Sequence, residues 1–159
     1  VGGTGARTAG VRILDAGPKH SPRFFIEDVR KGRWGAKDVE DMIQLCAFRD
    51  GHDCRIREEQ EGGSAGKAVI EARRRLLAGW DYQGVLATGD KETRANNLRA
   101  QAEGGEVALV RGPWNEEFLQ ELEVFPDGRT KDQVDASAHA FNELVTGVRP
   151  LKKANVRWG

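Results

Sequence analysis

The stretch Phe125-Pro-Asp-Gly-Arg-Thr-Lys-Asp132-Gln-Val-Asp135-Ala136 joins a turn to the start of a helix. Pro126-Asp-Gly128 is typical of a tight turn, and the residues from Asp132 to Val145 have the spacing of an amphipathic helix. The apolar face of that helix carries Val134, Ala138, Phe141 and Val145. The opposite face carries Asp132, Asp135 and His139, so the helix combines a core-facing side with an acidic side.

The two aspartates allow two interpretations. Asp132 could cap the helix while Asp135 is solvated, because a carboxylate at a helix start accepts from free backbone N–H groups. Alternatively, both could join another carboxylate from elsewhere in the chain. Converging carboxylates repel one another unless a cation neutralises them, so such a cluster would imply a metal site.

Upstream of this helix, the apolar pattern alternates between strand and helix periods. Strands are predicted at 11–14, 24–29, 54–57, 84–87 and 107–110, and helices at about 39–50, 69–76, 92–103, 114–122 and 132–145. The Gly- and Pro-containing segment 15–22 predicts a hairpin, and 58–63 predicts a polar turn. In the second helix, Val69, Ala72 and Leu76 are predicted to face the core, with Arg73 to Arg75 largely on the other faces. The alternation predicts an α/β fold, a mixed sheet flanked by helices.

Bulk composition limits the class of protein. A chain of 159 residues that is 38% hydrophobic and 31% charged has the composition of one folded domain, which we assign to 1–147, followed by a basic tail at 148–159. Its net charge of zero argues neither for nor against a polyanionic partner. Cys46 and Cys54 have no paired spacing, which favours a reduced, cytosolic setting. No apolar run approaches the roughly 20 residues that a membrane span needs.

The segment Gly62-Gly-Ser-Ala-Gly66-Lys67 superficially resembles a phosphate-binding loop. The spacing excludes one, because Glu61 stands where the first glycine belongs and Ala68 replaces the magnesium-binding hydroxyl. Glu61 instead follows a strand and precedes a helix, where α/β proteins place active groups. It could be a metal ligand or simply part of a solvated acidic turn with Glu58 and Glu59.

Several ordered motifs resemble the C-terminal nuclease domain of the large terminase subunits of tailed bacteriophages. They extend from about Phe24 to Leu144 and comprise Arg30-Lys-Gly-Arg-Trp34, Glu59-Gln-Glu-Gly-Gly-Ser-Ala-Gly-Lys67, Gly89-Asp-Lys-Glu-Thr-Arg-Ala95, Ala100-Gln-Ala-Glu-Gly-Gly105, Val107-Ala-Leu-Val-Arg-Gly-Pro-Trp-Asn115, Phe118-Leu-Gln-Glu-Leu122, Phe125-Pro-Asp-Gly128 and Asp132-Gln-Val-Asp-Ala-Ser-Ala-His-Ala-Phe-Asn142. Their consistent order is more specific than any one motif.

The resemblance implies an RNase H-like fold and a divalent-metal-dependent endonuclease that cuts concatemeric viral double-stranded DNA around packaging. Glu61, Asp132 and Asp135 would be the catalytic and metal-binding residues, with Lys131 in place of the family's first aspartate of the last motif. Oxygen ligands suit Mg²⁺ or Mn²⁺, and two-metal chemistry would use two ions. The DNA-binding candidates are Lys67, Lys91 and Arg94, each of which could instead be a solvated surface cation.

The resemblance also implies partners: a packaging ATPase domain of the same subunit, the portal and the small terminase, in the host cytoplasm without a membrane. Family members carry a first catalytic aspartate on an opening strand, whereas 1–8 is Gly-rich and contains no acid. Either that strand lies upstream of the given sequence or the protein has lost it. We expect the former, because the strand would be the central one of the sheet, and the first residue is Val rather than Met. Two alternatives stay open, an inactive nuclease-fold docking module and another RNase H-like enzyme such as a junction resolvase.

Overall fold

The computed structural model describes residues 7–146, so the predicted basic tail at 148–159 lies outside the described residues. The strands are β1 (Arg7–Asp15), β2 (Phe24–Arg33), β3 (Ile56–Gln60), β4 (Tyr82–Leu86) and β5 (Val107–Leu109). The helices are α1 (Ala36–Asp50), α2 (Gly63–Leu76), α3 (Lys91–Glu103), α4 (Asn115–Val124) and α5 (Asp132–Thr146). The predicted α/β order is confirmed. No helix in 7–146 is long and apolar enough to cross a membrane.

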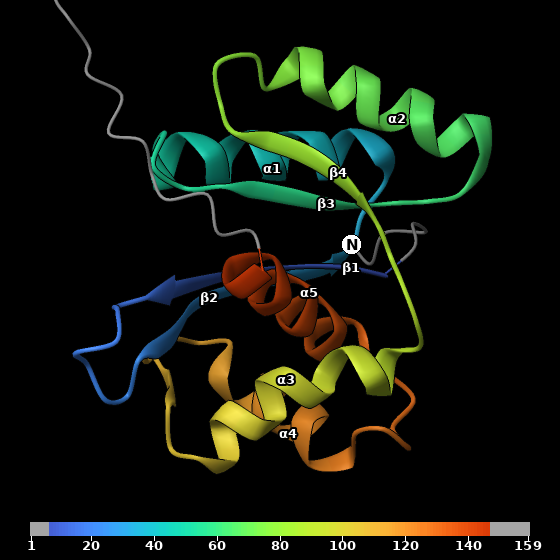
Figure 1. Ribbon diagram of the computed structural model, residues 1–159. Helices are drawn as coiled ribbons and strands as arrows, with labels where there is room; N and C mark the ends of the chain where they lie inside the picture. The colour runs from blue at the N-terminus through green and yellow to red at the C-terminus, as the bar shows by residue number, and fades with distance from the viewer. Residues whose placement is uncertain (1–6, 147–159) are drawn as a thin grey trace, which may run out of the picture.

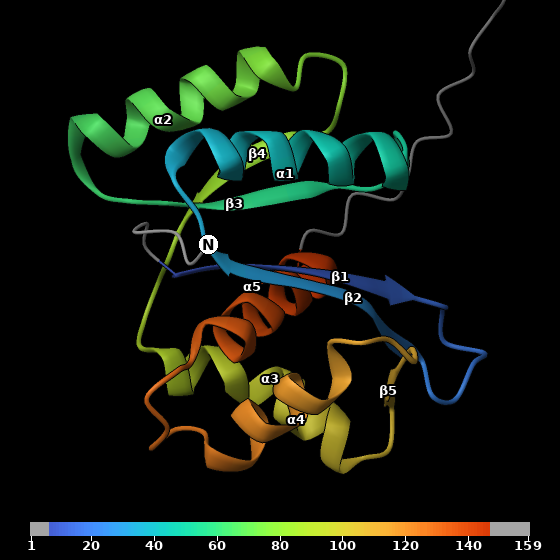
Figure 2. The same cartoon turned by 180° about the vertical axis from the view of Figure 1, so that it is seen from behind.

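The strands form two separate ladders. β1 and β2 form the predicted antiparallel hairpin, from Arg7 opposite Arg33 to Asp15 opposite Phe24, and β5 pairs in parallel with β2. β3 and β4 form a parallel pair of their own. Figures 1 and 2 show this pair with α1 and α2 in one half of the molecule, while α5, α3 and α4 lie on the other side of the hairpin. The prediction that the strands run in mixed directions is confirmed, because β2 pairs antiparallel with β1 and parallel with β5. β1 and β3 each lie at the edge of a ladder.

Ion pairs connect the two halves. Arg12 of β1 pairs with Asp50 at the end of α1, and Arg49 of α1 lies 2.8 Å from Asp28 of β2. Burial alone would raise the pKa of Asp28, but hydrogen bonds from Arg30 and Arg49 outweigh it and hold that pKa below its usual value. The hairpin is therefore tied to the β3–β4 half through charged side chains at α1.

The predicted apolar face of the last helix is confirmed in the core. Val134, Ala138 and Phe141 of α5 are buried, and Phe141 meets Phe24 of β2 edge to face with ring centroids 4.8 Å apart. A neighbouring cluster centres on Phe118 of α4, which is fully buried. α5 is thereby packed between the hairpin and the helices α3 and α4 (Figure 1), which fixes the position of its acidic residues.

The predicted core face of α2 is wrong. Val69 is 51% exposed, whereas Gly66, Ile70 and Arg73 are the buried residues of the helix. Arg73 is buried because its guanidinium donates to both carboxylate oxygens of Glu58, at 3.1 and 3.2 Å. The Tyr82 hydroxyl donates to the same carboxylate at 2.8 Å, so a paired arginine occupies a buried position of this face in place of an apolar residue.

The predicted turn at 58–63 is also misplaced. β3 runs two to three residues later than expected, so Glu58 to Gln60 belong to the strand and only Glu61 and Gly62 connect it to α2. The pattern misled because this strand is polar: Glu58 is paired with the arginine and tyrosine described above, and Glu59 is exposed. Cys46 and Cys54 are free thiols, and burial raises the pKa of both.

Candidate active site at the start of α5

A polar cluster that connects α3 and α5 surrounds Asp135. This residue is 8% exposed, and Arg94 donates to its Oδ1 atom from Nη2 at 2.6 Å and from Nε at 3.1 Å. The Lys91 ammonium lies 3.1 Å from Oδ2, so each carboxylate oxygen has a cationic partner. The interpretation of Asp135 as a solvated side chain is wrong, because α3 covers it and supplies two compensating charges.

Local capping positions both cations. Asp90 precedes α3, and its carboxylate accepts from Thr93 N at 2.8 Å and Thr93 Oγ1 at 3.1 Å. The backbone hydrogen bond from Thr93, followed by that from its hydroxyl, lowers the pKa of Asp90. Because Lys91 follows this cap directly and Arg94 lies one turn later, the start of α3 presents both side chains to α5.

Polar contacts then set the register between the two helices. Asn142 of α5 donates to the Arg94 carbonyl at 2.9 Å and accepts from Asn97 Nδ2 at 2.9 Å. Arg94 also donates to the Gly89 carbonyl at 2.8 Å, which holds the loop before α3. The Arg94–Asp135 pair is therefore fixed from both helices and from the preceding loop.

Asp132 is the first residue of α5, not its cap. The free N–H groups of Gln133 and Val134 donate instead to Oε1 of Glu121, at 2.7 and 3.0 Å. Gln133 Nε2 donates to the other oxygen of that carboxylate at 2.9 Å. Glu121 is 5% exposed, so α5 is capped by a buried residue of α4, and the half-buried Asp132 makes no hydrogen bond or ion pair within 7–146.

The predicted site residues Glu61 and Lys67 lie in the other half of the molecule, with β3 and α2. Glu61 is exposed between β3 and α2, and Lys67 is exposed on the first turns of α2. The end of β3 and the start of α5 lie toward the same side of the molecule (Figure 1). Among the described residues, however, no group of three or more His, Cys, Asp or Glu is placed to hold a metal ion, and this includes Glu61, Asp132 and Asp135. Of the six predicted residues, the structure brings Asp135, Lys91 and Arg94 together.

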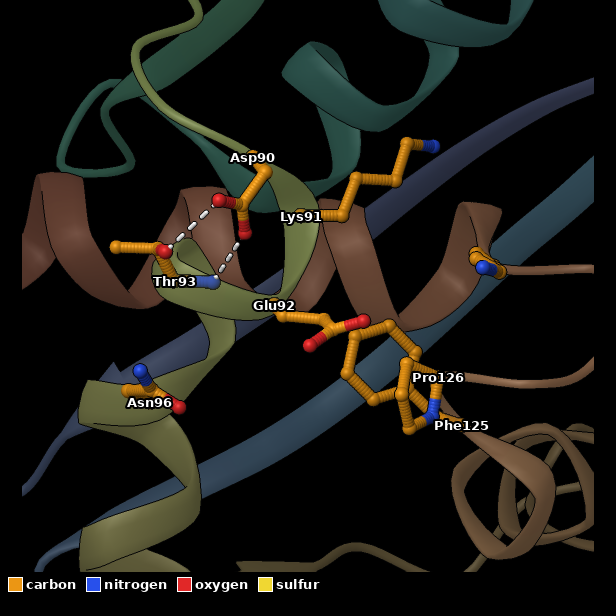
Figure 3. Close-up of a pocket in the computed structure, with 8 residues that line it drawn as sticks. Asp90, Lys91, Glu92, Thr93, Asn96, Phe125 and Pro126 are labelled. Atoms are coloured by element: carbon orange, nitrogen blue, oxygen red, sulfur yellow. Dashed lines mark hydrogen bonds between the residues drawn. The ribbon is translucent and has the colours of Figure 1, made fainter.

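A cavity of about 510 Å³ adjoins the cluster. Its lining comes from the start of α3 and from the segment before α5, and comprises Asp90, Lys91, Glu92, Thr93, Asn96, Phe125, Pro126 and Lys131. Figure 3 shows Glu92 directed toward Phe125 and Pro126, with Asp90 turned back onto Thr93. Lys91 belongs both to this lining and to the Asp135 cluster, so the cavity lies next to the acidic site.

His139 lies on the acidic face of α5, one turn after Asp135. It lines a smaller cavity of about 100 Å³ with Arg94, Glu143 and the end of β4. Its Nε2 atom is buried and has no hydrogen-bond partner within the described part of the chain. Glu121 was missed altogether, because its position on an acidic helix carries no signal that it reaches the next helix.

The Glu61 loop is sensitive to Gly66. A Cβ atom on Gly66 would lie 2.0 Å from the Glu61 carbonyl oxygen, so Gly66→Ala must displace the loop. Helix propensity alone would stabilise α2 by about 1 kcal/mol, whereas the clash should give a net loss of about 1–3 kcal/mol. Urea unfolding measures the difference, with Gly10→Ala as control because nothing lies within 4 Å of that position. A more stable Gly66→Ala protein would contradict the close approach.

Comparison with known proteins agrees with this architecture. The fold is a mixed α/β fold with an acidic helix, of the class that includes RNase H-like nucleases. The family model of the terminase RNaseH-like domain matches residues 26–144, and the chain belongs to that family. It matches the C-terminal nuclease domain of a terminase large subunit, which indicates a nuclease of a DNA-packaging motor. A search of curated proteins finds no match.

Proposed function

We propose that this domain is the endonuclease that cuts concatemeric viral double-stranded DNA when packaging begins and ends. Membership of the terminase RNaseH-like family carries the proposal, since the match spans all six predicted site residues. The buried Asp135 beside two cations supports it further. A few converging polar and charged side chains beside a cavity are typical of functional sites.

Mg²⁺ or Mn²⁺, as one or two ions, is the cofactor that this proposal requires. Glu61, Asp132 and Asp135 would supply carboxylate oxygens, the ligands that such cations prefer. In the described arrangement these residues do not fit a metal, because they form no group of three and Asp135 is already paired. No catalytic step is therefore assigned to a cation here.

The proposed substrate contacts use the same cationic residues. Lys67 is exposed and makes no ion pair within 7–146, so it is available to a phosphate group. Lys91 and Arg94 reach DNA in this proposal only to the extent that they leave Asp135. The packaging ATPase of the same subunit, the portal and the small terminase are the proposed partners, in the cytoplasm of the host cell.

A second candidate is a nuclease-fold module that binds DNA or docks onto the motor without cutting. The lack of a group of three acids within 7–146 favours this reading of the isolated chain. The two candidates share a fold, so only chemistry on DNA separates them.

The test is plasmid nicking by the full chain in Mn²⁺, with and without a chelator. We expect supercoiled plasmid to become open circles in the wild type, with loss of cutting on chelation. Glu61→Ala and Asp132→Ala should each slow cutting about tenfold or more. If both variants cut as the wild type does, the site assignment is wrong. If nothing cuts, even with an acidic opening strand supplied upstream, while plasmid is still retarded on a gel, the docking module is the function.

A further inference from the structure

We propose that Lys91 and Arg94 form an electrostatic lock on Asp135, which must be released before that carboxylate can bind a divalent cation. The inference rests on the proposed function for its biological meaning, but concerns a property of these three side chains. It gives Lys91 and Arg94 a role at the acidic site itself, in addition to any contact with DNA.

The first support is the occupancy of the carboxylate. Oδ1 of Asp135 accepts two hydrogen bonds from Arg94, and Oδ2 faces the Lys91 ammonium at 3.1 Å. The Asp135 and Arg94 side chains are only 11% and 13% exposed, so their pairing is weakly screened by solvent. A cation approaching either oxygen meets positive charge within hydrogen-bonding distance, which raises the free energy of its binding.

The second support is the need for compensation. A carboxylate this deeply buried is stable only when a positive charge accompanies it, because desolvation disfavours its charged form. The two α3 cations supply that charge now, and a divalent cation would supply it equally well. The α3 cations and a divalent cation cannot all contact the same two carboxylate oxygens, so metal binding competes with the lock for Asp135.

The third support shows which part of the lock opens. The Lys91 side chain is 43% exposed, against 13% for Arg94, and makes a single contact with Asp135 rather than two. Lys91 also lines the cavity of about 510 Å³ that carries the Glu92 carboxylate (Figure 3). Because its side chain is already partly in solvent, the Lys91 ammonium can leave Oδ2 for water, whereas Arg94 is also held by the Gly89 carbonyl.

The experiment measures Mn²⁺ binding alone, by isothermal titration calorimetry on the full chain without DNA. Lys91→Gln removes one arm of the lock and should tighten Mn²⁺ binding about fivefold or more, a coupling of ordinary size. The matched control is Arg99→Gln, which removes one positive charge from the same helix, where Arg99 pairs with Glu103 on the surface. The control should bind Mn²⁺ as the wild type does.

A double variant assigns the effect to Asp135. Adding Asp135→Asn to Lys91→Gln should abolish the gain, and circular dichroism melting confirms that each protein is folded. Equal Mn²⁺ affinity in the wild type and Lys91→Gln, including no binding by either, overturns the lock. The result is independent of DNA cutting. If Lys91→Gln tightens Mn²⁺ binding but no protein nicks plasmid, the lock is supported and the nuclease proposal fails. If the wild type nicks plasmid but Lys91→Gln leaves the Mn²⁺ affinity unchanged, the nuclease proposal is supported and the lock fails.

Discussion

Plasmid nicking should fall about 100-fold or more when Asp135 is replaced by Asn, the largest activity loss expected from any single change in this domain. The substitution keeps the shape of the side chain but removes the charge that holds Lys91 and Arg94 beside it. Any cation or polarised water that depends on this carboxylate loses its partner at the same time. Initial rates of open-circle formation in Mn²⁺ measure the loss.

The neighbouring Asp132 provides the comparison. It is half-buried, lies at the first residue of α5 and makes no polar contact within 7–146, so Asp132→Asn should slow nicking less than Asp135→Asn does. Melting curves of both variants separate lost chemistry from lost folding, because Asp135→Asn leaves two cations without their partner. The ranking is contradicted if Asp132→Asn is the slower enzyme.

The local pattern around 125–145 was sufficient to predict the last helix and its apolar face. Val134, Ala138 and Phe141 recur in the sequence at helical spacing, and all three are buried as predicted. The hairpin at 15–22 was predictable for the same reason, since its turn residues and flanking strands are contiguous. Periodicity depends only on residues that are close along the chain, and the contacts that define these two elements are of that kind.

Pairings between distant charged residues could not be predicted in this way. Arg73 was placed on an outer face because arginine is rarely buried, but Glu58, on the preceding strand, neutralises it. The same limit applies at the site, where 41 residues separate Arg94 from Asp135. The resemblance implied a metal-binding role for Asp135 and a DNA-binding role for Arg94, but no local pattern indicated that Arg94 neutralises Asp135.

Capping of α5 is a further case in which the partner lies outside the local pattern. The sequence offers Asp132 at the helix start, and a local rule favours it as the cap. The fold uses Glu121 because α4 packs against the start of α5 and brings a buried carboxylate to the unpaired N–H groups. The Asp132 carboxylate therefore takes no part in capping, and its role as a metal ligand stays a prediction.

Replacing Glu121 with Ala should therefore destabilise the domain by about 3 kcal/mol, the largest stability loss expected from a polar substitution here. The backbone N–H groups of Gln133 and Val134 and the Gln133 amide would lose their acceptor in a buried setting. Glu121→Gln should lose about half as much, because it keeps an acceptor oxygen but not the charge that favours a helix N-terminus. Thermal melting measures both, with a fall of about 10 °C expected for the alanine variant.

The control is Glu123→Ala, two residues along the same helix, where the side chain is exposed and the change should stay within about 0.5 kcal/mol. Equal melting temperatures for the two alanine variants would show that Glu121 does not cap α5. The two effects also connect stability to function, since Asp135 is on the first turn of the helix that Glu121 caps. Glu121→Ala should loosen that turn before the rest of the domain unfolds, so nicking should decline at temperatures where circular dichroism still reports a folded protein.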